Sequence, residues 1–62
     1  MDRIITLEEA AAQLRTPPAT LRYWRHRNTG PRSFKVGRRV MYLEDDIATW
    51  LQRQYDTPSP AA

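Results

Sequence analysis

A chain of 62 residues without cysteine has room for one small domain, and it excludes both a disulfide framework and a thiolate metal site. No stretch has the length and apolarity of a signal peptide or a membrane span, so neither is expected. The net charge of +3 conceals a segregation: the window from Ala10 to Leu43 holds eight Lys and Arg, while all seven acids lie outside it. Because such a window repels itself, we expect it to bind a polyanion.

The segment ITLEEAAAQL, residues 5–14, predicts a first helix. Thr6 is the expected N-cap, and Glu9 three residues later completes the sequence pattern of a capping box. An apolar stripe with helical spacing is formed by Leu7, Ala10, Ala11 and Leu14. The small residues in this stripe favour the close approach of another helix.

A second helix is predicted immediately afterwards, with Thr16 as its cap and Pro17 at its first position. Leu21 and Trp24 have the spacing of its buried side. The segment NTGP, residues 28–31, contains the breakers Gly and Pro and ends this helix. Because so few residues separate the first two helices, the sequence predicts a helix-turn-helix.

Two short β-prone runs follow, SFKV and VMY, and both alternate with period two on either side of GRR. They predict a two-stranded hairpin in which Gly37 permits the tight turn and Arg38 and Arg39 lie at the tip. The aromatic residues expected in the core are Trp24, Phe34, Tyr42 and Trp50.

The segment LEDDIATWLQRQ, residues 43–54, predicts a third helix. Its acidic start suits the positive end of the helix dipole. Ile47, Trp50 and Leu51 are expected to face the core. Residues 1–54 are predicted to form one domain and residues 55–62 a disordered tail. The predicted fold is mainly α with a small β-hairpin: a winged helix-turn-helix of three helices and a two-stranded wing.

A helical wheel of the second helix places Ala19, Arg22, Tyr23 and His26 on the side opposite Leu21 and Trp24, with Arg25 and Arg27 on the flanks. A helix with this outer face, beside a hairpin tipped with arginines, has the size and charge to lie in a DNA major groove. The hairpin would then reach the sugar-phosphate backbone or the adjacent minor groove. The residues expected to bind DNA are Arg15, Ala19, Arg22, Tyr23, Arg25, His26, Arg27, Lys35, Arg38 and Arg39.

Other classes of function find less support. His26 is the lone histidine and there is no cysteine, so no metal site, cofactor or catalytic residue is predicted. RNA binding lacks an exposed aromatic platform on a sheet. A protein-interaction module would leave the basic window unexplained, although the acids from Glu44 to Asp46 remain a candidate surface for a protein partner.

The segments EAA, TLRYW, GP, KVGRRVMY and D-I-x-x-W-L follow one another with a familiar order and spacing. Over roughly residues 4 to 53 the chain resembles the winged helix-turn-helix modules of the excisionase type, which are related to the DNA-binding domains of MerR-like regulators. In that family the second helix reads the major groove and the wing contacts the minor groove or backbone. The resemblance therefore implies DNA contacts by Arg22, Tyr23, His26, Arg38 and Arg39. Many members have glycine where this chain has Arg15, so a different turn backbone and an added phosphate contact are expected.

The resemblance also implies a role. MerR-like regulators continue into a long dimerisation helix and an effector domain, whereas this sequence ends shortly after its third predicted helix. An excisionase is the closer analogue: a phage or mobile-element protein that binds and bends attachment-site DNA and directs an integrase toward excision. A small phage or plasmid transcriptional regulator is the alternative. The expected partners are double-stranded DNA, an integrase and further copies arranged head to tail on DNA. A monomer in free solution and a cytoplasmic location in a bacterial host are also expected.

Overall fold

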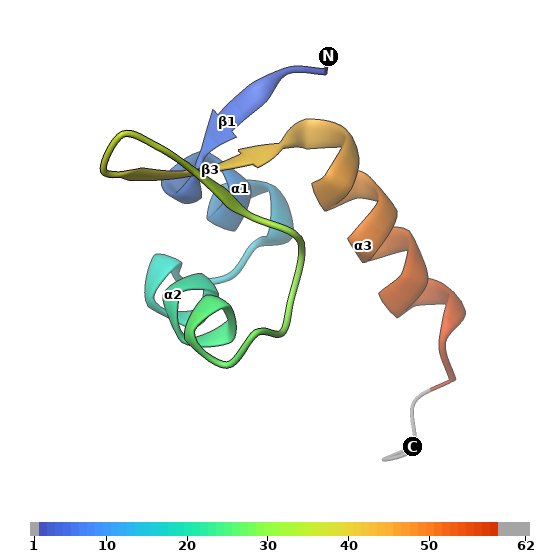
Figure 1. The fold of residues 1–62 in the computed structure, drawn as a ribbon. Helices are drawn as coiled ribbons and strands as arrows, with labels where there is room; N and C mark the ends of the chain where they lie inside the picture. The colour runs from blue at the N-terminus through green and yellow to red at the C-terminus, as the bar shows by residue number, and fades with distance from the viewer. Residues whose placement is uncertain (1, 59–62) are drawn as a thin grey trace.

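Figure 1 shows the fold in a computed structural model, which describes residues 2–58. The elements in chain order are β1 (Ile4–Thr6), α1 (Leu7–Leu14), α2 (Pro18–His26), β2 (Phe34–Val36), β3 (Arg39–Leu43) and α3 (Glu44–Asp56). The predicted helices and hairpin are all present, and the mainly α fold with a β wing is the expected winged helix-turn-helix. In this described part of the chain, no helix has the length and apolarity needed to cross a membrane.

β1 was not predicted, and it turns the expected two-stranded wing into a three-stranded antiparallel sheet of order β1-β3-β2. β3 pairs with β1 through its second half, where Tyr42 faces Ile5, and with β2 through its first half, where Arg39 faces Val36. A strand of three residues is too short to show a period, and its partner is distant in the sequence. The backbone pairing continues past the sheet, because Glu44 N donates to Arg3 O at 2.9 Å.

The start of α1 confirms the predicted capping box. Thr6 Oγ1 accepts a hydrogen bond from Glu9 N at 3.0 Å, and Glu9 Oε1 accepts one from Thr6 N at 2.9 Å. These bonds to Thr6 lower the pKa of the Glu9 carboxyl, with smaller contributions from the charges of Arg3 and Arg39. The ionised carboxylate therefore helps to fix the first turn of α1 beside the sheet.

The start of α2 differs from the prediction by one residue. Thr16 was expected to cap the helix, but the N-cap is Pro17, and Pro18 is the first helical residue. The reason is that Thr16 still belongs to the end of α1. Its side-chain oxygen is buried and has no hydrogen-bond partner within residues 2–58, so it caps nothing.

The end of α1 forms a Schellman motif. Thr16 N donates to Ala11 O at 3.0 Å, and Arg15 N donates to Ala12 O at 3.1 Å. Arg15 has a φ of 55°, in the left-handed region that glycine favours. Placing an arginine there costs about 1–2 kcal/mol, yet it produces the sharp turn that brings α2 against α1.

The core lies between the sheet and the helices. Its buried apolar residues are Ile5, Leu7, Ala10, Ala11, Leu21, Tyr42 and Ile47, with Leu14, Trp24 and Val40 packed against them. The predicted alanine-containing stripe of α1 is thus confirmed. Trp24 of α2 also contacts Trp50 of α3, with ring centroids 5.2 Å apart and planes tilted by 43°. This aromatic pair joins the second and third helices.

Two residues predicted for the core lie elsewhere. Directly opposite residues of a sheet share a face, and Phe34 pairs with Met41, so it lies on the face away from Tyr42. There Phe34 is half-buried. The two-residue turn fixes this register, which alternation within each strand cannot reveal. Leu51 of α3 is 47% exposed rather than inward-facing, because Ile47 and Trp50 already fill that helix's contact with the rest of the domain.

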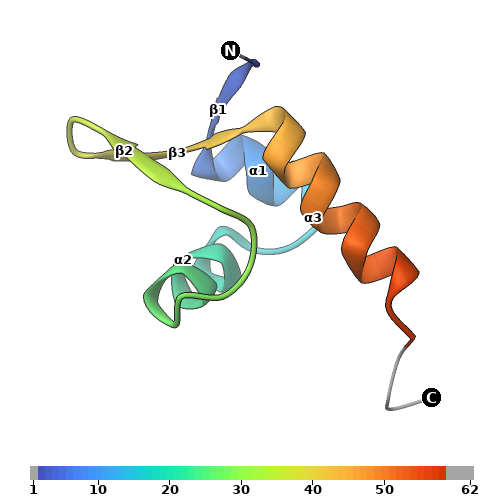
Figure 2. The same cartoon turned by 45° about the vertical axis from the view of Figure 1, so that its right-hand side comes forward.

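α3 lies on the side of the molecule opposite the tip of the β2–β3 hairpin in both Figure 1 and Figure 2. Its acidic first turn is held by the N-terminal segment and by α1: Asp45 N donates to Asp2 Oδ2, and the Glu44 carboxylate accepts from Gln13 Nε2 at 2.8 Å. The helix continues to Asp56, two residues beyond the predicted domain boundary at residue 54. Of the predicted tail, residues 59–62 lie outside the described residues.

Candidate nucleic-acid interface

All ten residues predicted to bind DNA are exposed. They come from three places: the turn after α1 (Arg15), α2 with its C-cap (residues 19–27), and the hairpin (residues 35–39). In both fold views α2 and the hairpin tip lie on the side of the domain away from α3 (Figures 1 and 2). We call this side of the domain, made by α2 and the hairpin, the basic face; Arg32 of the basic window is an exception, because it lies beside α3.

α2 has the shape required of a recognition helix. Its inner side is fixed by Leu21, which is 1% exposed, and by the packing of Trp24 against the core. Nine helical residues span about 13 Å, a length that fits a major groove of about 12 Å width. The outer side is free of core contacts, and Tyr23 is 57% exposed on it.

Arg22 forms an ion pair with Glu8, an acid that precedes the basic window in the sequence. Its Nη2 lies 3.1 Å from Glu8 Oε2 on α1, and both side chains are 60% exposed. Glu8 and Arg22 also line a shallow depression of about 240 Å³ together with Leu7, Arg39 and Val40. Glu8 therefore contributes a negative charge to the edge of the basic face. Sequence reasoning missed it because only the close packing of α1 on α2 brings the two residues together.

Tyr23 and Arg27 form a pair on the outer side of α2. Arg27 Nη1 donates to Tyr23 Oη at 3.2 Å, and its guanidinium carbon lies 5.7 Å from the centre of the Tyr23 ring. The spacing of four residues on a helix makes this contact possible, and the ring attracts the cation. The Tyr23 side chain is thus positioned by the Arg27 guanidinium and carries a polar hydroxyl at the end of its ring.

The hairpin turn consists of Gly37 and Arg38, since Val36 and Arg39 already pair across the strands. Gly37 has a φ of 63° and Arg38 does not have a positive φ, the pattern of a type II′ turn. Arg38 is therefore at the tip as predicted, whereas Arg39 is the first residue of β3 and lies near Glu8 and Glu9 of α1. Lys35 shares a sheet face with Val40, the face that packs on the helices.

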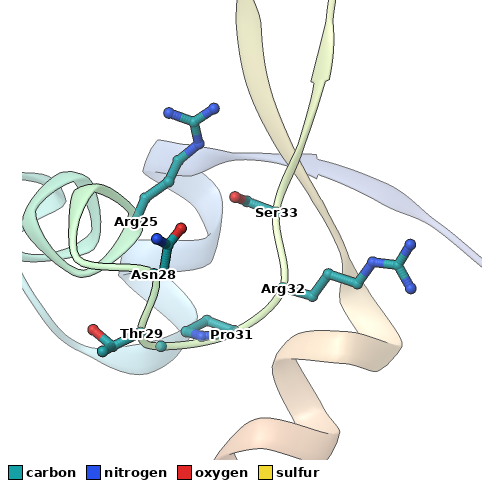
Figure 3. Close-up of a pocket in the computed structure, with 7 residues that line it drawn as sticks. Arg25, Asn28, Thr29, Pro31, Arg32 and Ser33 are labelled. Carbon is teal, nitrogen blue, oxygen red and sulfur yellow. The ribbon is translucent and has the colours of Figure 1, made fainter.

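The loop from α2 to β2 was not predicted to be part of the site. It encloses an open depression of about 500 Å³ lined by Arg25, Asn28, Thr29, Gly30, Pro31, Arg32 and Ser33. Figure 3 shows Arg25 and Ser33 on its two sides. A sequence signal was present, since Asn and Ser flank the Gly-Pro pair, but such residues are also ordinary in turns.

The conformation of this loop is set by α2 and its tryptophan. Asn28 N donates to Arg25 O at 3.1 Å and Thr29 N to Trp24 O at 2.8 Å, a second Schellman motif, with Asn28 at a φ of 56°. Gly30 follows with a φ of 78°, and a Cβ there would lie 3.0 Å from Trp24 Cβ. Only glycine fits this position, and it fixes the loop directly against the core.

The arrangement suits the binding of an anion. No group of His, Cys, Asp and Glu that could hold a metal ion is found among residues 2–58. Burial raises the pKa of the Tyr42 hydroxyl, against the opposing charge of Arg25, so this core residue stays neutral at physiological pH. What the surface presents is cationic and hydrogen-bond-donating side chains on a protruding helix and an adjacent hairpin.

Comparison with known proteins agrees with this geometry. Residues 4–55 match the family described as "Helix-turn-helix domain", and this match includes all the helices and the wing except the last residue of α3. No match to the chain was found among curated proteins or among solved structures. Membership of such a family supports a sequence-specific DNA-binding protein rather than an enzyme. The chain belongs to the helix-turn-helix domain family.

Proposed function

We propose that this protein recognises specific sequences of double-stranded DNA with the outer side of α2 in the major groove. Arg22, Tyr23 and His26 would contact base edges from the protruding side of the helix. The observation that carries the proposal is that α2 and the arginine-tipped hairpin lie on the same side of the fold (Figure 2). The surrounding cations would hold the phosphates, which carry most of the affinity for DNA.

The position of the wing on the duplex would follow from the placement of α2. With α2 in the major groove, the hairpin tip is directed to the neighbouring backbone or minor groove, where Arg38 is favoured by the negative potential. The acids at the start of α3 would lie away from the duplex, which they would otherwise repel, because α3 is on the opposite side of the domain. Arg15, at the turn between α1 and α2, would contribute a phosphate contact.

Our finer proposal is an architectural role of the excisionase type. The protein would bind adjacent sites in attachment DNA, bend the DNA between them and direct an integrase toward excision. Its support is the family, which is associated with excisionase-like proteins, together with the order of motifs in the sequence. A protein that acts on bacterial or phage DNA in this way would work in the cytoplasm of the host cell.

Cooperative filling of neighbouring sites would use the charge layout of the domain. A single module covers about 600–1,000 Å² of protein surface on DNA, which limits the specificity of one copy. The basic face on one side and the acids of α3 on the other allow copies along one duplex to touch head to tail. In free solution, where DNA does not align the copies, we expect a monomer.

The proposed role is tested by excision and integration assays with a candidate integrase, run with and without the protein. The proposal predicts that the protein raises excision and suppresses integration. Unchanged recombination, with altered transcription from a promoter near the bound site, would identify a transcriptional regulator instead. Circularly permuted fragments should show position-dependent mobility if the DNA is bent, and uniform mobility would contradict bending.

A further inference from the structure

Near the end of α2 and in the α2–β2 loop, Arg25, Asn28 and Ser33 have side-chain donors that no other described group uses. Arg22 is engaged by Glu8, and Arg27 is engaged by Tyr23. The side chains of Arg25, Asn28 and Ser33 make no hydrogen bond or ion pair with any other part of residues 2–58. A guanidinium, a carboxamide and a hydroxyl together supply several N–H and O–H donors.

These donors surround one depression. Figure 3 shows the Ser33 hydroxyl turned toward the Arg25 side of the depression, with the Asn28 side chain between α2 and the ascending loop. The residues that line the depression include no acid, and Arg25 is the arginine among them that lies beside Asn28 and Ser33. Such a set, with positive charge and neutral donors from two directions, matches the oxygens of a phosphate group.

The position of the depression selects the source of the phosphate. It lies between the end of α2 and the start of β2, the two elements that would enter neighbouring grooves of a duplex. One sugar-phosphate strand must run between a helix in the major groove and a wing on the adjacent minor groove. Burial raises the pKa of the Tyr42 hydroxyl on β3 and the charge of Arg25 opposes this rise, which agrees with a guanidinium between α2 and the sheet.

We infer that Arg25, Asn28 and Ser33 form a binding site for a backbone phosphate of the DNA strand that passes between α2 and the wing. This inference rests on the proposed DNA binding and adds a phosphate site to it. The loop would thereby set the register of the domain on the duplex, since phosphate contacts fix the position of the reading helix. The left-handed Asn28 and the tightly packed Gly30 would keep the site preformed.

Arg32 provides a matched control for Arg25. It carries the same charge and also lines the depression, from the α2–β2 loop, but Figure 3 shows it extending away from the other side chains. Its other neighbours are Asp46, Thr49, Trp50 and Arg53 of α3, around a second depression. Arg25→Gln and Arg32→Gln therefore remove equal charge from two places around one depression.

The experiment measures affinity for one duplex as a function of salt concentration. Arg25→Gln should make the slope of log K against log[salt] shallower by about 0.9, the value for one lost phosphate contact. Arg32→Gln should leave the slope unchanged. Asn28→Gly, which keeps the positive φ accessible, and Ser33→Ala should each weaken binding about threefold without changing the slope. Thermal melting should show all four variants folded.

Two results would overturn the site. Equal changes in slope for Arg25→Gln and Arg32→Gln would mean that only the overall charge matters. Full affinity in both Asn28→Gly and Ser33→Ala would mean that Arg25 acts without a built site.

Inorganic phosphate tests whether the site binds free phosphate instead of the DNA backbone. If phosphate displaces the duplex more strongly than chloride does at equal ionic strength, the site is one for free phosphate. Failure of the wild-type protein to bind DNA would instead refute the proposed function itself.

Discussion

The two flanks of α2 carry arginines in different states. On the flank toward α1, Arg22 is 3.1 Å from the Glu8 carboxylate. On the flank toward the α2–β2 loop, Arg25 lines a depression whose other residues include no acid. The sequence gives no sign of this difference, because the basic window that contains both arginines has no Asp or Glu. The comparison shows that the distribution of charge along a chain differs from its distribution on the folded surface.

From this difference we propose different tasks for the two flanks. A carboxylate beside Arg22 restrains its guanidinium and reduces its net attraction for phosphate, which suits a side chain that reads bases. An arginine without an acid, such as Arg25, contributes its full charge to phosphate binding. Specificity would therefore come mainly from the flank toward α1, and affinity mainly from the flank toward the loop.

The largest expected effect comes from Trp24, which underlies both flanks. Trp24→Ala should lower the free energy of unfolding by about 3–5 kcal/mol, because it removes the contact with Trp50 and the support of Gly30. So small a domain is not expected to remain folded after such a loss. Thermal or urea unfolding checks this, with Trp24→Phe as a milder control. A folded Trp24→Ala protein that had lost only DNA binding would place Trp24 at the interface.

Gly30→Ala should affect the loop flank selectively. A Cβ at this position would meet Trp24 at 3.0 Å and occupy a backbone with φ of 78°, so we expect a loss of about 2–3 kcal/mol. Gly37→Ala is the control: its φ is also positive, but a Cβ there would meet nothing within 4 Å. Denaturant unfolding should rank Gly30→Ala as the more damaging. Equal losses would mean that strain alone matters and that the contact with Trp24 does not.

The division between reading and holding is tested by Arg22 and Arg38. Arg22→Ala should lose about 1–3 kcal/mol on the preferred sequence and much less on unrelated DNA, because a base contact is lost. Arg38→Ala, at the tip of the hairpin, should weaken binding to all sequences about equally. Titration of both variants against preferred and scrambled duplexes provides the measurement. Equal loss of specificity in the two variants would contradict the division.

The smallest expected effect is an increase in affinity. Glu8→Gln removes a negative charge from the edge of the basic face and should strengthen binding to unrelated DNA by about 0.5 kcal/mol at low salt. On the preferred sequence the gain should be smaller, because Arg22 loses its restraint. Asp56→Asn, at the end of α3, is the control and should change neither affinity. A uniform gain on both sequences would show that Glu8 acts only through its charge.

Local signals sufficed for most of the fold. Thr6 and Glu9 are close in sequence, so their capping box could be predicted from residue types alone. β1 could not, because its stability depends on pairing with a strand at the other end of the domain. The outward placement of Phe34 was missed for a different reason, because it depends on the register that the two-residue turn gives the hairpin.

The candidate site divides in the same way. The exposure of Arg22, Tyr23 and His26 follows from helical periodicity once Leu21 is assigned to the core. The Glu8–Arg22 pair depends on how two helices pack. The path of the α2–β2 loop places Asn28 and Ser33 around the same depression as Arg25. Sequence periodicity identifies which side of an element is exposed, but the neighbours across elements appear only in the folded chain.

The central claim is that the basic face of α2 and the hairpin binds DNA through its phosphates. The salt dependence of binding to a short duplex tests it most directly. If the face neutralises about five phosphates, log K against log[salt] should have a slope of about −4 to −5. A slope shallower than about −2 would contradict the account, because the cations of this face would then not be the ones that bind DNA.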